Sequence, residues 1–349
     1  MPGKFLGYPF DEEIFLMNWK AAQDPTLTAM IESGAVVEDA QIAGLINNGS
    51  NVYTIPVYNV LGGDEDNYDG QTNITVSEPD AHSQTGVVYG RAHAWKDRDF
   101  IHDFNSGANP TVQIASQVAK FWQKKRQNRL LGILGGIFGI SDDTTDLWDK
   151  WQLHTLNIAA ASGSVSDANM VSEATAAEAV QKAVGDNAGI FTMSIMHSKI
   201  ALALAKLQLL QFRKYTDAAG IERTVNIADY NGMTVIVDDG VPVVASTGVS
   251  GAFEYTTYLF GAGSLRKASA PVKHPVETDR VTLTDGGYDV LINRFRETIH
   301  PNGFSYTLPT VSGSKVVSPT DAQLAASANW SLAGSDPKTI AIARVISNG

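Results

Sequence analysis

Residues 116–139 read SQVAKFWQKKRQNRLLGILGGIFG, and this stretch decides the fold. Its apolar side chains recur at intervals of three and four residues from Val118 to Phe138, which is the periodicity of one helix face. Asn109 and Pro110, shortly before it, are typical of a helix cap and of the first helical position. The pattern therefore predicts one helix of about 28 residues, roughly 40 Å long at 1.5 Å per residue.

The end of this helix carries two overlapping pairs of glycines spaced by four residues, Gly132/Gly136 and Gly135/Gly139. In an apolar membrane helix this spacing is typical of a dimer face. The apolar run 130–140 is much shorter than the stretch of about 20 residues that spans a bilayer, and acids follow it closely. We therefore expect no membrane contact and interpret the four glycines as close-packing positions, where another backbone, a sheet or an arm, approaches the helix.

The chain has 349 residues, of which 44% are hydrophobic, a formal net charge of −11 and no cysteine. This length supports a sizeable core, and the lack of cysteine excludes disulfides, thiol nucleophiles and thiolate metal sites. A dedicated nucleic-acid-binding protein is usually basic, so we expect any contact with nucleic acid to be local. No Walker A loop, GxSxG or HExxH motif occurs, and the seven histidines are scattered. We therefore predict a protein that is not an enzyme, without catalytic, cofactor-binding or metal-binding residues.

Two charged segments are candidate contact surfaces. The middle of the long helix carries five cations with no acid between them: Lys120, Lys124, Lys125, Arg126 and Arg129. They form either a solvated or intersubunit helix face, or a sequence-independent contact with the phosphates of nucleic acid.

The second charged segment is the tip of a long two-stranded excursion over residues 46–90, which requires another surface to pack on. Its acids are Asp64, Glu65, Asp66 and Asp69, and we interpret them either as a solvated loop or as a tip that docks on another protein, as at a subunit interface. A calcium-loop template that starts at Asp64 fails, because Thr75 stands where a glutamate is needed.

The rest of the chain mixes helices and strands without a regular βαβ repeat, which indicates an α+β fold. Thr175 and Glu178 predict a capping box for a helix that ends at Gly185. Ser198 is expected to cap a second apolar helix. The segment 233–245 predicts a hairpin with Asp239-Gly240 at its turn.

This order of an arm, a long hairpin, a long helix, a compact mixed region and late strands resembles the major capsid proteins of tailed bacteriophages, with the Hong Kong 97-like fold. The helix 116–139 is similar to the spine helix of that family. Three further passages carry the resemblance: AVQKAVGDNAGIFTMSIMHSKIALALAKLQLLQF (179–212), NGMTVIVDDGVPV (231–243) with YTTYLFGAGSL (255–265), and RFRETIHPNGFSYT (294–307) with SPTDAQLAASANWSL (318–332).

The resemblance implies a definite division of the chain. It implies an N-terminal arm over 1–45, an extended loop over 46–104, and a peripheral domain over 105–170 and 271–349, with the spine helix at 109–138. An axial domain would span 171–270.

The resemblance also implies a function. Copies of the chain are expected to assemble as hexamers and pentamers into an icosahedral shell around packaged double-stranded DNA, in the cytoplasm of the bacterial host. The arm begins at Met1, whereas some members fuse a scaffolding segment to this end, so we expect a separate scaffolding protein and a portal as partners. The alternatives are an encapsulin-like bacterial compartment and a tail or tailocin structural protein.

Overall fold

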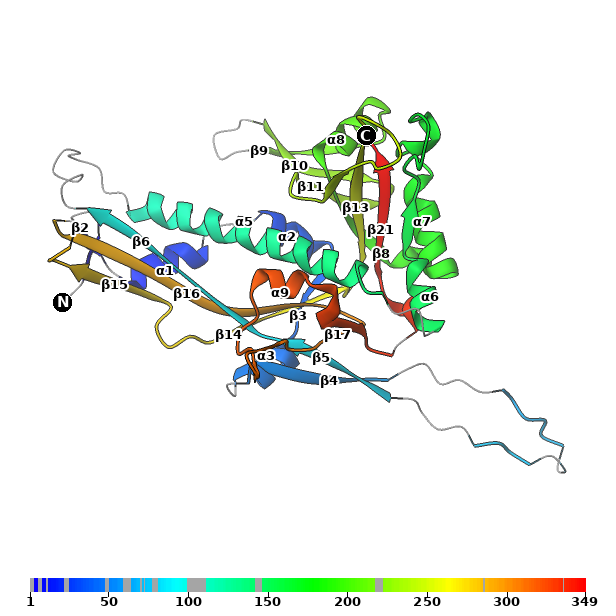
Figure 1. Cartoon of the computed structure of the whole chain (residues 1–349), viewed down its shortest axis with the longest axis horizontal. Coiled ribbons are helices and arrows are strands. Elements are labelled where there is room, and N and C mark those ends of the chain that lie inside the picture. Colours follow the sequence, from blue (N-terminus) through cyan, green and yellow to red (C-terminus); the bar gives the residue numbers. More distant parts are fainter. Residues whose placement is uncertain are drawn as a thin grey trace.

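A computed structural model describes the chain except for residues 1–2, 6–7, 11, 22–24, 48–49, 59–63, 70, 72, 77–80, 99–110, 142–145, 217–221, 285 and 335. Helices and strands form an elongated body, and an extended hairpin points away from it (Figure 1). The expected cap at Asn109 and Pro110 lies outside the described residues.

Helix α5 (Thr111–Phe138) runs through the middle of the molecule and contributes to two hydrophobic clusters. Val118 and Trp122 in its first half pack with the arm helix α1 (Glu12–Ala21), and the Trp122 ring lies 4.7 Å from that of Phe295. Its second half buries Ile133, Leu134 and Ile137 completely in the main core. The predicted apolar stripe therefore forms one continuous buried face along the helix.

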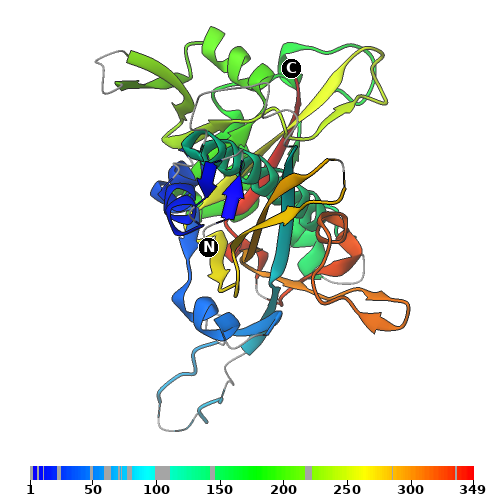
Figure 2. The ribbon, with the colours of Figure 1, turned by 90° about the vertical axis from the view of Figure 1, so that its left-hand side faces the viewer.

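A five-stranded sheet lies along α5, with the N-terminal helices of the arm beside them (Figure 2). Helix α1 packs against both α5 and this sheet. Strand β16 is central, because it pairs antiparallel with β14, β15 and β6. Strand β3 extends the sheet by pairing parallel to β14. The strands are β3 (Val36–Glu38), β6 (Tyr89–Arg98), β14 (Leu265–Ala270), β15 (Val276–Val281) and β16 (Tyr288–Pro301).

The arm and the hairpin precede α5 in the chain. The arm contains β1 (Gly3–Phe5), β2 (Tyr8–Phe10), α1, α2 (Pro25–Glu32) and α3 (Ala40–Asn47). Strands β4 (Val52–Tyr58) and β5 (Ala81–Val87) form a separate two-stranded sheet. Within it Tyr53 is paired with Gly86, and a Cβ at position 86 would lie 2.2 Å from the tyrosine ring, so only glycine admits this ring.

An eight-stranded sheet forms the other end of the molecule, with the strand order β7-β21-β13-β8-β11-β10-β9 and β12 paired to β13. Helices α7 (Thr175–Val184) and α8 (Ser198–Lys206) pack on it through a second apolar cluster. Its strands are β7 (Thr155–Asn157), β8 (Phe191–Met196), β9 (Gln211–Thr216), β10 (Glu222–Tyr230), β11 (Met233–Val237), β12 (Val243–Ala245), β13 (Phe253–Gly261) and β21 (Ile342–Asn348).

Short elements connect the two sheets. Helix α6 (Asp146–Gln152) follows α5, and helix α9 (Asp321–Ala325) with the turn η3 (Ser327–Asn329) packs on α5. The remaining elements are η1 (Asp167–Asn169), η2 (Gly185–Ile190), β17 (Phe304–Tyr306), β18 (Thr310–Val311), β19 (Ser314–Lys315), β20 (Trp330–Leu332) and η4 (Pro337–Thr339).

Three local predictions were wrong. The segment 233–245 is not a hairpin, because β11 pairs with β10 and β8 while β12 pairs with β13. The real hairpin turn is Asn231-Gly232, where both residues have positive φ, as a type I′ turn requires. Thr175 is already helical and its hydroxyl accepts from the Ser172 amide, so it forms no capping box. The cap of α8 is His197, whose Nδ1 accepts from the amide of Lys199, rather than Ser198.

Candidate assembly surfaces

The extended hairpin is fixed to the body at its base. The Tyr53 hydroxyl lies 3.0 Å from the Thr298 hydroxyl in a buried position. The Gln84 side chain donates to the carbonyl of Pro301 and accepts from the amide of Gly303, both at 3.3 Å. These bonds join β4 and β5 to the end of β16, so the base of the hairpin moves with the five-stranded sheet.

The acidic tip of the hairpin is fully exposed. Asp64, Glu65, Asp66 and Asp69 all face solvent. The Asp66 carboxylate accepts from the amide and hydroxyl of Thr75 across the loop. Three large apolar side chains beside these acids are also exposed, at 94% for Tyr68, 76% for Ile74 and 87% for Val76. Apolar side chains gathered at a projecting tip are typical of a contact surface.

The five cations of α5 divide into two groups. Arg126 and Arg129 are bound within the chain: Arg126 Nη2 lies 3.1 Å from Glu297, while Arg129 lies 3.4 Å from Glu297 and 2.7 Å from Asp321. The Arg129 side chain is only 2% exposed. This arginine is therefore occupied in the folded chain and is not on the free surface of the helix.

The arginine cluster also joins the base of the hairpin to α5. Arg129 lies over the ring of Tyr89 at 4.6 Å, and Arg91 lies 2.6 Å from Asp321. Burial opposes ionisation of Asp321, but hydrogen bonds from Arg129 and Arg91 outweigh it and hold the pKa of this carboxyl below its usual value. Asp321 therefore stays charged and connects β6, α5 and α9.

The three lysines form the second group. Lys120, Lys124 and Lys125 are exposed, and none of them makes an ion pair with any residue that the structure describes. Lys125 lies over the Phe121 ring at 5.7 Å. Of the predicted basic patch, only these three side chains are available to another molecule.

The four glycines of α5 differ in their surroundings. A Cβ at Gly136 would lie 3.1 Å from the Ala325 carbonyl and from the Trp330 ring, and one at Gly139 would lie 3.2 Å from Ser327. A Cβ at Gly132 would make ordinary contact with Ala325 at 3.5 Å. One at Gly135 would meet no atom of the described chain within 4 Å. The elements that approach are helix α9, the turn that follows it and strand β20, which carries Trp330, all from the same chain. A contact of these glycines with a neighbouring copy stays a prediction.

Two further features bear on other classes of protein. No helix among the described residues is long and apolar enough to cross a membrane. The same part of the chain contains no group of three or more metal-ligating side chains.

Sequence reasoning did not find Glu297, Asp321 or Asp238, the acids that face α5. Glu297 and Asp321 lie 168 and 192 residues beyond Arg129. No local pattern pairs residues so far apart, so only the fold identifies them.

No protein-family model matches the sequence. The chain is 30% identical to the major capsid protein of Bacillus phage SPP1 over 318 residues, and this aligned region covers 90% of each protein. Its fold is similar to the capsid of Ralstonia phage GP4, with a TM-score of 0.51 at 10% identity over 78% of this chain and 84% of that one. These relatives are structural proteins of virus shells and not enzymes. With an α+β fold of the Hong Kong 97 type, the chain belongs to the major capsid proteins of tailed bacteriophages.

Proposed function

We propose that copies of this chain assemble as hexamers and pentamers into an icosahedral shell around packaged double-stranded DNA, in the cytoplasm of the bacterial host. The extended hairpin is the observation that carries the proposal. Its base is bonded to the body, while its tip exposes Tyr68, Ile74 and Val76 on a projecting loop. Burial of such side chains against a neighbouring copy supplies a driving force for assembly.

The proposal divides the chain into an arm over 1–45, an extended loop over 46–104, a peripheral domain over 105–170 and 271–349, and an axial domain over 171–270. The two large sheets support this division, because the eight-stranded sheet is built mainly from the axial range. Strands β7 and β21 cross the boundary, since they belong to the peripheral range and pair within the axial sheet.

Charge complementarity suggests how copies contact one another and their contents. The acidic hairpin tip and the exposed lysines of α5 carry opposite charges, which favours contact between neighbouring copies. The same lysines suit a sequence-independent contact with DNA phosphates. We expect a separate scaffolding protein and a portal to take part in assembly.

Expression of the chain with its scaffolding protein, followed by negative-stain electron microscopy, tests the proposed shell. We expect closed particles with five- and six-fold clusters. A chain that remains monomeric under all assembly conditions, with the scaffolding protein present, would contradict the proposal.

Charge reversal tests the lysine surface. The variant Lys120→Glu/Lys124→Glu/Lys125→Glu should lower the yield of particles or their retention of DNA. A matched control reverses three exposed lysines away from α5: Lys273, Lys315 and Lys338. Normal, DNA-filled particles from the α5 variant would remove the electrostatic role of these lysines, and equal loss in the control would show a general charge effect instead.

A further inference from the structure

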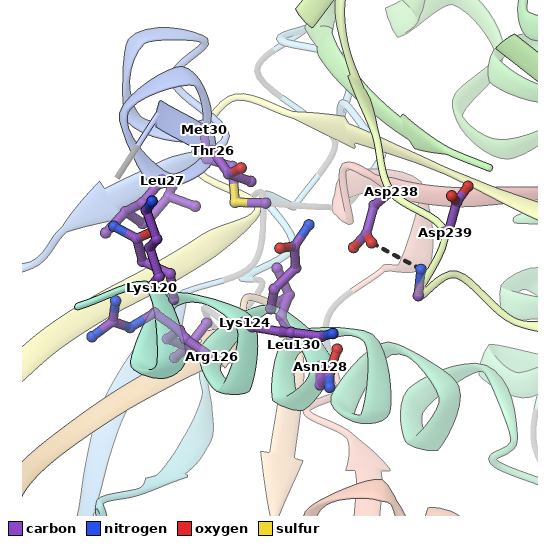
Figure 3. Close-up of a pocket in the computed structure, with 15 residues that line it drawn as sticks. Thr26, Leu27, Met30, Lys120, Lys124, Arg126, Asn128, Leu130, Asp238 and Asp239 are labelled. Carbon is purple, nitrogen blue, oxygen red and sulfur yellow. Dashed lines mark hydrogen bonds between the residues drawn. The ribbon is translucent and has the colours of Figure 1, made fainter. Parts of the chain in front are cut away.

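A cleft of about 600 Å³ lies between helix α5, helix α2 and the turn that follows β11 (Figure 3). Lys120, Lys124 and Asn128 line the helix side, and their spacing of four residues places them on one helix face. Asp238 and Asp239 line the opposite side. The two walls therefore carry charges of opposite sign.

The walls touch at one end of the cleft. A Cβ at Gly240 would lie 3.3 Å from Leu131 Cδ1 and 3.5 Å from Asn128 Oδ1, so the backbone of the turn rests directly on α5. Lys124 precedes Asn128 by four residues, about 6 Å along the helix axis. Lys124 is therefore the lysine of the cleft that lies closer to this contact along the helix.

The two aspartates have different partners. Asp239 Oδ1 accepts from the amide of Ser198 at 3.1 Å and lies 3.6 Å from His197 Nε2, so this carboxylate is bound to the start of α8. Asp238 Oδ1 accepts from the amide of Gly240 at 2.8 Å. Its second oxygen, Oδ2, is buried and has no hydrogen-bond partner in the described chain. A buried carboxylate oxygen without a partner is unfavourable.

Lys124 carries the complementary charge. Its side chain is exposed and it makes no ion pair with a described residue in this conformation. Figure 3 shows Lys124 and Asp238 on opposite sides of the cleft. A movement of the turn toward the helix brings the ammonium group of Lys124 to the carboxylate oxygen of Asp238 that has no partner. Closure also removes from water the apolar side chains that line the cleft, Leu27, Met30 and Leu130.

We propose that the cleft is poised to close, with the β11–β12 turn rocking about its Gly240 contact until Lys124 Nζ pairs with Asp238 Oδ2. The chain then has an open and a closed conformation, which differ in the angle between its eight-stranded sheet and α5. Under the proposed function, two angles let one sequence occupy both five-fold and six-fold positions. That consequence rests on the proposed shell, whereas closure itself is a property of the single chain.

Zero-length crosslinking with a carbodiimide tests the closure in the unassembled full chain, because it joins an amine to a carboxylate only when they meet. We expect a Lys124–Asp238 crosslink in peptide mass spectrometry. The Lys267–Glu38 pair, already 3.3 Å apart, is the internal reference. Lys124→Arg keeps the charge but has no amine to couple, and Asp238→Asn has no carboxylate, so each should lose only the cleft crosslink.

Salt provides a second criterion, since screening weakens exposed charge pairs. The yield of the Lys124–Asp238 crosslink should fall several-fold between low and high ionic strength. The proposal is overturned if the reference pair is joined while Lys124 and Asp238 are not, or if Lys124 is joined mainly to a different carboxylate.

A thiol crosslinker gives an independent measurement, because the chain has no cysteine of its own. In the variant Lys124→Cys/Asp238→Cys the two thiols are the only ones present. A direct disulfide needs Cα atoms within about 7 Å, which is shorter than the reach of a lysine paired with an aspartate, so a bismethanethiosulfonate reagent with a linker as long as a lysine side chain should join the thiols in the folded, unassembled chain. Absence of this crosslink in a chain with native circular dichroism would count against closure. A wild-type chain that crosslinks at the cleft and still forms no shell would overturn the proposed function and leave the closure standing.

Discussion

The glycines of α5 lead to a prediction with an internal control, the pair of variants Gly136→Ala and Gly135→Ala. At position 136 the new methyl group would lie 3.1 Å from both the Ala325 carbonyl and the Trp330 ring. Trp330 is held there, because its Nε1 donates to the Leu324 carbonyl at 2.7 Å and its side chain is buried. At position 135 the methyl group would meet no described atom within 4 Å.

The expected magnitudes follow from these surroundings. Replacing glycine by alanine inside a helix stabilises the helix by about 1 kcal/mol, and this gain is common to both variants. Forcing a methyl group into a packed contact costs about 1–3 kcal/mol. Gly135→Ala should therefore be more stable than the wild type by about 1 kcal/mol. Gly136→Ala should be less stable than Gly135→Ala by about 1–3 kcal/mol.

Urea unfolding of the unassembled subunit, followed by tryptophan fluorescence and circular dichroism, measures this difference. The urea midpoint of Gly135→Ala should be higher than that of the wild type. The midpoint of Gly136→Ala should be lower than that of Gly135→Ala. If the two variants are equally stable, the contact between α5 and α9 is looser than these distances imply, and the explanation of Gly136 as a close-packing position is wrong.

Two further predictions concern buried charge and pH. Asp321→Asn weakens the contacts to Arg129 and Arg91 and should lower the free energy of unfolding by about 1–2 kcal/mol, discounted because Asp321 is half exposed. The pKa of Asp321 is lowered in the folded chain, so its contribution to the free energy of unfolding is fully present above its unfolded pKa of about 4. This contribution is lost as the pH falls through the lower, folded pKa. The unfolding free energies of wild type and variant, measured by urea titration, should therefore converge at low pH. Burial lowers the pKa of His300 to about 4, so the folded chain keeps this ring neutral while the unfolded chain takes up a proton below about pH 6.5. His300 should therefore lower the free energy of unfolding by about 3 kcal/mol as the pH falls from 6.5 to 4. The variant His300→Gln should have a flatter pH profile over this range. If the two profiles are the same, the ring is protonated in the folded chain without cost in stability.

The parts of the fold that follow from local sequence were predictable. The long helix α5 was predicted correctly, because its apolar periodicity spans many turns and can be recognised without knowledge of the residues that pack on it. Helix α9 begins after Thr320, whose hydroxyl accepts from the amide of Gln323 in a true capping box. By contrast, Thr175 and Glu178 have the same spacing, but Ser172 engages the Thr175 hydroxyl first. A spacing rule does not reveal such competition.

Strand pairing was harder, because it depends on residues far apart in the chain. Asp239-Gly240 is a typical hairpin signal, yet the strands on either side pair elsewhere, β11 with β8 and β12 with β13. The turn is instead occupied by contacts with Ser198 and with α5. A turn signal in the sequence thus predicted a change of direction, but not which strands it would bring together.

The two roles of the basic run of α5 could not be predicted for the same reason. In the sequence its five cations form one patch, whereas in the fold the arginines and the lysines lie on different faces of the helix. Arg126 and Arg129 point to acids of β16 and α9, so the helix is fixed to the five-stranded sheet and, through Arg91, to the base of the hairpin. Lys124 lines the cleft on the other side of the helix, opposite Asp238 and Asp239 of the axial range. Of these two carboxylates, Asp238 keeps one oxygen, Oδ2, without a hydrogen-bond partner in the described chain. Any change of angle between the two halves is therefore expected at the lysine face, because the arginine face is already closed.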